Sequence, residues 1–199
     1  MNQENYYHIY NRGAHRAETF LDDMDYLRML KLLYIANNDE PFVLSQLPEN
    51  VYSIERKQPL VEIAAYCLMP NHIHIALRKN GGGVGLNDNL SRFVHKLMTG
   101  YSSYFNKKYR HSGTIWQGPF KTKDVCDDLY VQTLIRYIHL NPCDLVALNE
   151  NESEEQYRKK ILDFAVNYEY SSLKDYLGII RPQRAILEAS PLGGLASWK

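Results

Sequence analysis

Two histidines placed two residues apart are the first feature of this sequence that could do chemistry. His72 and His74 belong to an apolar run that continues to Leu77 and predicts a strand. Because side chains alternate along a strand, both imidazoles point to one face while Ile73 and Ile75 point to the other. Imidazole binds divalent cations, but a catalytic metal site needs further ligands. The pair therefore begins a metal site or forms the polar edge of a half-buried sheet.

A tyrosine and an asparagine form a second candidate pair. Tyr137 and Asn141 are four residues apart on a helix predicted to begin at Asp127 or Asp128 and to end before Pro142. Residues with this spacing share a helix face. Tyr137 is then a core residue or a half-buried phenol with its hydroxyl free, and Asn141 also suits a helix terminus. The spacing alone decides neither case.

Positive charge is concentrated in one part of the chain, although Lys plus Arg equals Asp plus Glu at 23 each. No Asp or Glu occurs between Asn89 and Lys123. The cations of this segment are Arg92, Lys96, Lys107, Lys108, Arg110, Lys121 and Lys123, with tyrosines and Trp116 interleaved. Such a segment is a solvated helix face with a basic loop, or a strip that binds phosphates and stacks on bases. Arg12 and His8 of the first predicted strand could line the same surface or be ordinary surface groups.

The elements that position these residues follow from hydrophobic patterning. We predict strands over 5–12, 60–68, 73–77, 113–117 and 122–125, and helices over 22–38, 86–105, 127–141 and 154–166. This order indicates the α+β class, with a ferredoxin-like antiparallel sheet and helices packed on one face. We expect residues 1–148 to form this domain and residues 149–199 to add a C-terminal helical extension and a tail.

Composition and short motifs exclude several other classes of protein. The chain of 199 residues has 45% hydrophobic and 23% charged residues, as globular domains do. It shows no apolar segment long enough to span a membrane and no signal peptide, which favours the cytoplasm. Its three cysteines argue against a disulfide framework and a Cys-rich zinc site. The glycine-rich loop at 81–85 lacks the Gly-Lys-Ser/Thr ending of a P-loop.

Several motifs, taken in order, resemble those of one family of DNA enzymes. The run from Met69 to His74 resembles the His-hydrophobic-His (HUH) signature of single-strand DNA transposases and relaxases. Within the single-tyrosine transposases of insertion sequences, the run from Tyr137 to Pro142 is similar to the tyrosine helix of the REP-associated tyrosine transposases. Further matching motifs are Tyr7 to Gly13, Tyr104 to Asn106, Trp116 to Gly118 and Tyr170 to Ser172. The resemblance extends over about residues 5–177.

This resemblance implies a fold, a site and a reaction. It implies the HUH endonuclease fold, with His72, His74 and Asn141 coordinating Mg²⁺ or Mn²⁺ and Tyr137 as the nucleophile. The chain would cleave and rejoin single-stranded, hairpin-forming DNA through a 5′-phosphotyrosine intermediate, as a monomer or a homodimer. A phenol ordinarily ionises at a pH of about 10, so a cation at the phosphate would assist its attack. Arg12 and the seven cations named above become candidate DNA contacts.

Two segments depart from the pattern of the family. Cys143-Asp144-Leu145 follows Pro142 where many relatives have Val-Arg-Ala, and Gly118-Pro119-Phe120 replaces a common Gly-Arg-Tyr. Each departure removes one positive charge, which bears on how these flanks bind DNA. The alternative functions are a catalytically silent regulator of the same family that binds hairpin DNA, and a small metal hydrolase unrelated to DNA. We expect His139, which points to another side of its helix, to be structural.

Overall fold

The fold is described by a computed structural model of the chain. The structure describes residues 5–43, 46–79, 86–149 and 151–188. The glycine-rich loop expected at 81–85 and the tail from residue 189 onward lie outside these ranges. None of the helices in these ranges combines the length and the apolar character needed to cross a membrane. The three cysteines are free thiols.

A four-stranded antiparallel sheet forms the centre of the molecule. The strands are β1 (Tyr6–Arg12), β2 (Val61–Met69), β3 (His72–Lys79) and β4 (Lys121–Val125), in the spatial order β2-β3-β1-β4. The predicted hairpin is confirmed, because β2 and β3 are joined by a tight turn at Pro70 and Asn71. The segment 113–117 is not a strand; it makes only an isolated bridge between Trp116 and Gly13.

The register of β1 aligns a set of polar side chains with the two histidines. Tyr10 pairs with His74 and Arg12 with His72 across the β1–β3 ladder. On the other side of β1, Lys121 pairs with Tyr10 and Lys123 with His8. Since residues paired across a ladder lie on the same face, one face carries both histidines together with His8, Tyr10, Arg12, Lys121 and Lys123.

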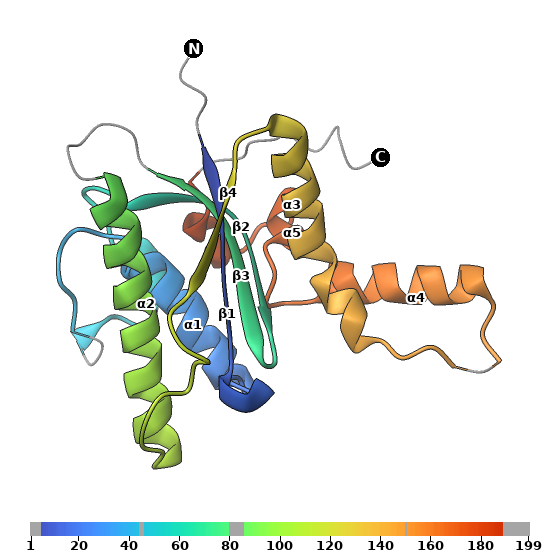
Figure 1. Cartoon of the computed structure of the whole chain (residues 1–199), viewed down its shortest axis with the longest axis horizontal. Helices are drawn as coiled ribbons and strands as arrows, with labels where there is room; N and C mark the ends of the chain where they lie inside the picture. Colours follow the sequence, from blue (N-terminus) through green and yellow to red (C-terminus); the bar gives the residue numbers. More distant parts are fainter. Residues whose placement is uncertain (1–4, 44–45, 80–85, 150, 189–199) are drawn as a thin grey trace.

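Helices cover both faces of the sheet (Figure 1). Helices α1 (Asp23–Ile35) and α2 (Leu86–Tyr109) pack against each other on the face where Ile73 and Ile75 are fully buried. Helix α3 (Asp128–Leu140) packs on β2 and β3 from the histidine face. The α+β class is confirmed. The expectation that helices share one face holds for α1 and α2, whereas α3 lies on the opposite face.

The chain after α3 returns to the sheet and holds that helix in place. It forms the 3₁₀ helix η4 (Asn141–Leu145), helix α4 (Glu154–Asn167), the short helix α5 (Leu173–Tyr176) and the 3₁₀ helix η5 (Pro182–Ile186). Between α4 and α5 the backbone runs beside β2, where Leu68 N donates to Tyr170 O and Ser172 N to Tyr66 O, both at 3.0 Å. The segment thereby covers the outer edge of β2.

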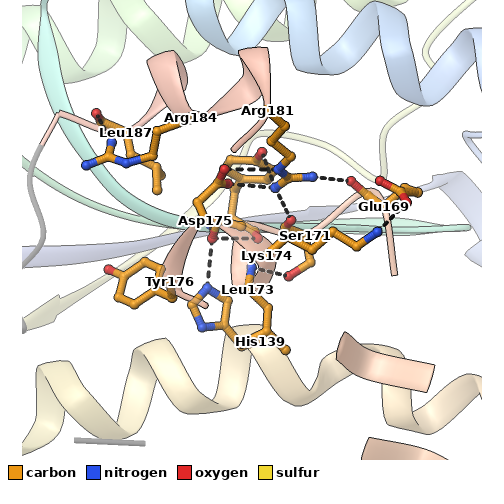
Figure 2. Close-up of polar contacts among 12 residues, drawn as sticks. His139, Glu169, Ser171, Leu173, Lys174, Asp175, Tyr176, Arg181, Arg184 and Leu187 are labelled. Carbon is orange, nitrogen blue, oxygen red and sulfur yellow. Dashed lines mark hydrogen bonds and ion pairs between the residues drawn. The ribbon is translucent and has the colours of Figure 1, made fainter. Parts of the chain in front are cut away.

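His139 connects α3 to this returning segment (Figure 2). The imidazole is fully buried, its Nε2 lies 2.8 Å from Ser172 Oγ, and its ring packs edge-on against Tyr176 at 4.8 Å between centroids. Arg181 fixes the segment in turn through an ion pair with Asp175 at 2.6 Å. His139 is therefore a structural residue that docks α3 against the edge of the sheet.

The burial of His139 makes a testable contribution to stability. Burial, reinforced by the charge of Arg181, lowers the pKa of His139 to about 3. A histidine in the unfolded chain has a pKa of about 6.5 and takes up a proton below it, so this stability is present above pH 6.5 and is lost as the pH falls toward 3. We expect the wild type to lose about 2 kcal/mol more unfolding free energy than His139→Gln between pH 7 and pH 5. Urea unfolding at both pH values measures this difference, and equal losses in the two proteins would contradict it.

Candidate active site

Side chains from three elements converge on the histidine face of the sheet. The rings of His72 and His74 of β3 lie 5.0 Å apart between centroids. The phenol ring of Tyr137 from α3 lies edge-on to His74 at 5.4 Å and to His8 of β1 at 6.1 Å. All four side chains belong to one chain, so a single chain brings the predicted nucleophile beside the predicted metal ligands.

Asn141 completes this cluster at the C-terminal end of α3. Its side chain is only 5% exposed, and its Oδ1 lies 3.4 Å from His72 Nε2. The amide nitrogen donates to the backbone oxygen of Tyr137 at 2.7 Å. Because the NH₂ group is used in this hydrogen bond, the oxygen is the atom that faces the imidazole.

The other hydrogen bond of His72 determines which of its nitrogens carries the proton. Nδ1 lies 2.6 Å from Asn71 Oδ1, and the Asn71 amide nitrogen donates to Arg16 O at 3.3 Å. This network assigns the proton to Nδ1 and a lone pair to Nε2. Burial lowers the pKa of His72, so the ring is neutral at pH 7. Two acceptor atoms, His72 Nε2 and Asn141 Oδ1, thus face each other.

His74 is prepared as a ligand by its contact with His8. Its Nδ1 lies 2.8 Å from His8 Nε2, which leaves Nε2 as the nitrogen that can bind a cation. Burial, together with the neighbouring His72 and His8, lowers the pKa of His74 to about 3. The ring is therefore neutral at pH 7, as metal binding requires.

The donor set fits a single divalent cation. Two facing acceptors repel each other unless a cation lies between them, and a second neutral imidazole stands beside them. Among the described residues no three His, Cys, Asp or Glu side chains form a metal cluster, so the candidate set is two imidazoles and one amide. The amide oxygen suits Mg²⁺ and Mn²⁺, and imidazole binds divalent transition-metal ions. Three protein ligands leave positions for water or substrate.

A groove of about 350 Å³ adjoins the histidines on the face of the sheet. We call it the sheet groove, and its lining includes Tyr10, Arg12, Gln117 and Lys121 as well as both histidines. The Lys121 ammonium lies 6.0 Å from the centre of the Tyr10 ring. Lys123 is close enough for its charge to add to the burial that lowers the pKa of His8 to about 4. Three of the predicted DNA contacts, Arg12, Lys121 and Lys123, therefore lie beside the site.

The five other predicted DNA contacts lie on α2 or directly after it, and α2 packs on the opposite face. Arg92 forms an ion pair with Asp39, and Lys96 donates to the backbone oxygen of Glu40 at 2.9 Å. Lys108 pairs with Asp22 and Asp25 at 2.7 Å each. Lys107 lies in the last turn of α2, and Arg110 directly follows the helix. The structure does not bring these five cations to the histidines.

Sequence reasoning left the role of His8 open. The alternation of His8, Tyr10 and Arg12 along β1 was the available signal, since it places all three on one face. The expected fold places the first strand beside the hairpin, but the sequence does not contain the register of β1 against β3, which brings His8 against His74.

Comparison with known proteins identifies the family of this chain. Residues 3–141 match the family described as "Transposase IS200 like", so the chain belongs to the IS200-like transposases. A structure of a REP-associated tyrosine transposase bound to a REP hairpin is similar over 99% of this chain and 90% of that one, with 14% identity and a TM-score of 0.53. A Deinococcus radiodurans protein assigned as a transposase matches 67% of this chain and 87% of its own, with 16% identity and a TM-score of 0.39. No protein with a curated description matches the sequence.

The hydrogen bond between His8 and His74 yields a prediction about metal affinity. We expect His8→Ala to weaken Mn²⁺ binding by about 10- to 100-fold, because the His74 ring loses the partner that orients it. His8→Gln keeps an acceptor for His74 Nδ1 and should weaken binding less. Isothermal titration of Mn²⁺ into the full chain without DNA measures both, with Thr122→Ala as the control, because Thr122 of the neighbouring strand pairs with Ile9 and lies on the opposite face of the sheet. An unchanged Mn²⁺ affinity in His8→Ala would show that the contact with His8 is not needed to orient His74 for metal binding.

Proposed function

We propose that this chain is a divalent-metal-dependent, single-tyrosine endonuclease and strand transferase that acts on single-stranded DNA. The observation that carries the proposal is the convergence of the Tyr137 phenol with two neutral imidazoles and an amide oxygen. Membership of the IS200-like transposases supports it. The phenol is 52% exposed, so it is accessible to a DNA strand and is not a core residue.

Each residue of the cluster has a role in the proposed reaction. His72, His74 and Asn141 would hold Mg²⁺ or Mn²⁺. The bound cation would withdraw charge from a non-bridging phosphate oxygen and orient the phosphorus for in-line attack. Because all three ligands are neutral, they add no negative charge that would repel the anionic substrate. His8 would keep the His74 ring in its binding orientation.

The proposed covalent step exchanges one phosphate ester for another. The Tyr137 hydroxyl oxygen attacks the phosphorus and gives up its proton to solvent, while the bond from phosphorus to the 3′ oxygen breaks. The 3′ oxygen takes up a proton and leaves as a hydroxyl, and the 5′ end of the cut strand remains on Tyr137. A 3′-hydroxyl from another strand can reverse this step and join new ends without ATP.

The sheet groove supports a nucleic-acid substrate. Arg12, Lys121 and Lys123 offer cations to phosphates, and Tyr10 offers a ring on which a base can stack. The similar REP-associated tyrosine transposase was solved with a REP hairpin. On that basis we propose a single strand that carries a hairpin as the substrate of this chain.

The formation of a covalent adduct tests the proposed function. We would incubate the full chain and Mn²⁺ with a pool of 3′-labelled hairpin oligonucleotides that have randomised single-stranded flanks. The wild type should give a labelled adduct on a denaturing gel, and Tyr137→Phe should give none because it lacks the attacking oxygen. Tyr130→Phe is the matched control, since Tyr130 is another exposed tyrosine of α3, and it should react like the wild type.

The other outcomes of this experiment identify the alternatives. Binding of the hairpins by the wild type without an adduct would favour a silent DNA-binding regulator. Neither binding nor an adduct would favour a metal hydrolase unrelated to DNA. An adduct that persists in Tyr137→Phe would contradict the assignment of Tyr137.

A further inference from the structure

A second groove lies where α3, η4 and α4 meet, and Tyr137 is part of its lining. It has a volume of about 490 Å³, and we call it the α4 groove. Its lining includes Tyr137, Leu140, Asn141, Asp144, Arg158 and Leu162. Asp144, Arg158 and Leu162 follow the residues 3–141 that match the family. This groove is therefore completed by a part of the chain to which the family match assigns no role.

The walls of the α4 groove are apolar and accessible. Leu140 is 39% exposed and Leu162 is 51% exposed, beside the half-exposed ring of Tyr137. Large apolar side chains gathered at one exposed concave surface mark a binding site more often than scattered ones do. Apolar side chains of this kind can pack against the flat faces of an unstacked nucleobase.

The polar groups of the α4 groove carry opposite charges. Arg158 and Asp144 are both exposed, and neither has a hydrogen bond or an ion pair with any residue in the described ranges. The guanidinium offers several donors in one plane, and the carboxylate offers only acceptors. Asp144 lines the same groove as Asn141, which places the carboxylate near the proposed cation site.

The α4 groove adjoins the proposed active site. Tyr137 and Asn141 line this groove, while His72 and His74 line the sheet groove, and Asn141 Oδ1 lies 3.4 Å from His72 Nε2. A strand whose phosphate sits at the histidines has a flank on each side of the cut. If one flank follows the cations of the sheet groove, the other leaves past Tyr137 into the α4 groove.

We propose that the α4 groove binds one unstacked nucleobase next to the scissile phosphate and prefers guanine; this inference rests on the proposed function. The α4 groove does not suit the binding of phosphates alone, because the Asp144 carboxylate would repel them. A base offers donors as well as acceptors on its edges. Guanine presents the O6 and N7 acceptors to the Arg158 guanidinium and its amino donor to the Asp144 carboxylate, between the walls of Leu140 and Leu162.

The test measures base preference separately from cleavage. A hairpin that gives the adduct would be made with A, C, G, T or an abasic site at each nucleotide flanking the cut, and its binding would be followed by fluorescence anisotropy. The wild type should bind guanine roughly tenfold or more tighter than an abasic site at one of the two positions. Arg158→Gln should lose the preference for guanine over the other bases. Leu162→Ser should weaken the binding of all four bases and keep their order.

Lys159→Gln is the matched control for Arg158→Gln. Lys159 is the next residue of α4 but lines a different surface with Val146 and Gln156, so its variant should keep the wild-type preference. An adduct with no base preference at either position, or an unchanged guanine preference in Arg158→Gln, overturns the inference and leaves the proposed function standing. A wild type that forms no adduct with any hairpin overturns the proposed function and the inference with it.

Discussion

The facing pair of acceptors, His72 Nε2 and Asn141 Oδ1, is the interaction on which the rest of the site depends. Each orientation is fixed by a hydrogen bond on the far side of its group, from His72 Nδ1 to Asn71 and from the Asn141 amide to the backbone of Tyr137. Neither group can turn away without losing that bond. At 3.4 Å the two atoms have a favourable interaction only through a cation or a proton, and burial disfavours the proton on His72. The arrangement therefore favours a metal ion.

The geometry of α3 explains how one helix serves both the fold and the site. An α-helix turns about 100° per residue, so Asn141 lies about 40° from Tyr137, whereas His139 lies about 200° away. His139 is buried against Ser172 and Tyr176, and Tyr137 and Asn141 consequently face the histidines. The C-terminal segment thus contributes to the site indirectly, because it sets the rotation of the helix that carries the phenol and the amide.

Local patterns in the sequence predict single strands and helices better than they predict which of these elements pair or pack with each other. Strand alternation places His72 and His74 on one face, and helical spacing pairs Tyr137 with Asn141, but neither pattern contains the position of β1 between β3 and β4. Ion pairs between distant parts of the chain are also not visible in the local sequence. The segment from Asn89 to Lys123 has no acidic residue, yet Lys108 meets Asp22 and Asp25, and Arg92 meets Asp39, through the packing of α1 against α2. Such pairings join residues far apart in the chain, so a linear count of charges overestimates the free cations of α2.

Electron paramagnetic resonance of Mn²⁺ bound to the full chain, with detection of nitrogen couplings, tests the central claim most directly. We expect one bound Mn²⁺ with two directly coordinated imidazole nitrogens. We also expect a marked loss of affinity in Asn141→Leu, which keeps the approximate size of the side chain but removes its oxygen. A wild-type spectrum without coupling to histidine nitrogen, or equal Mn²⁺ binding by Asn141→Leu, would contradict it.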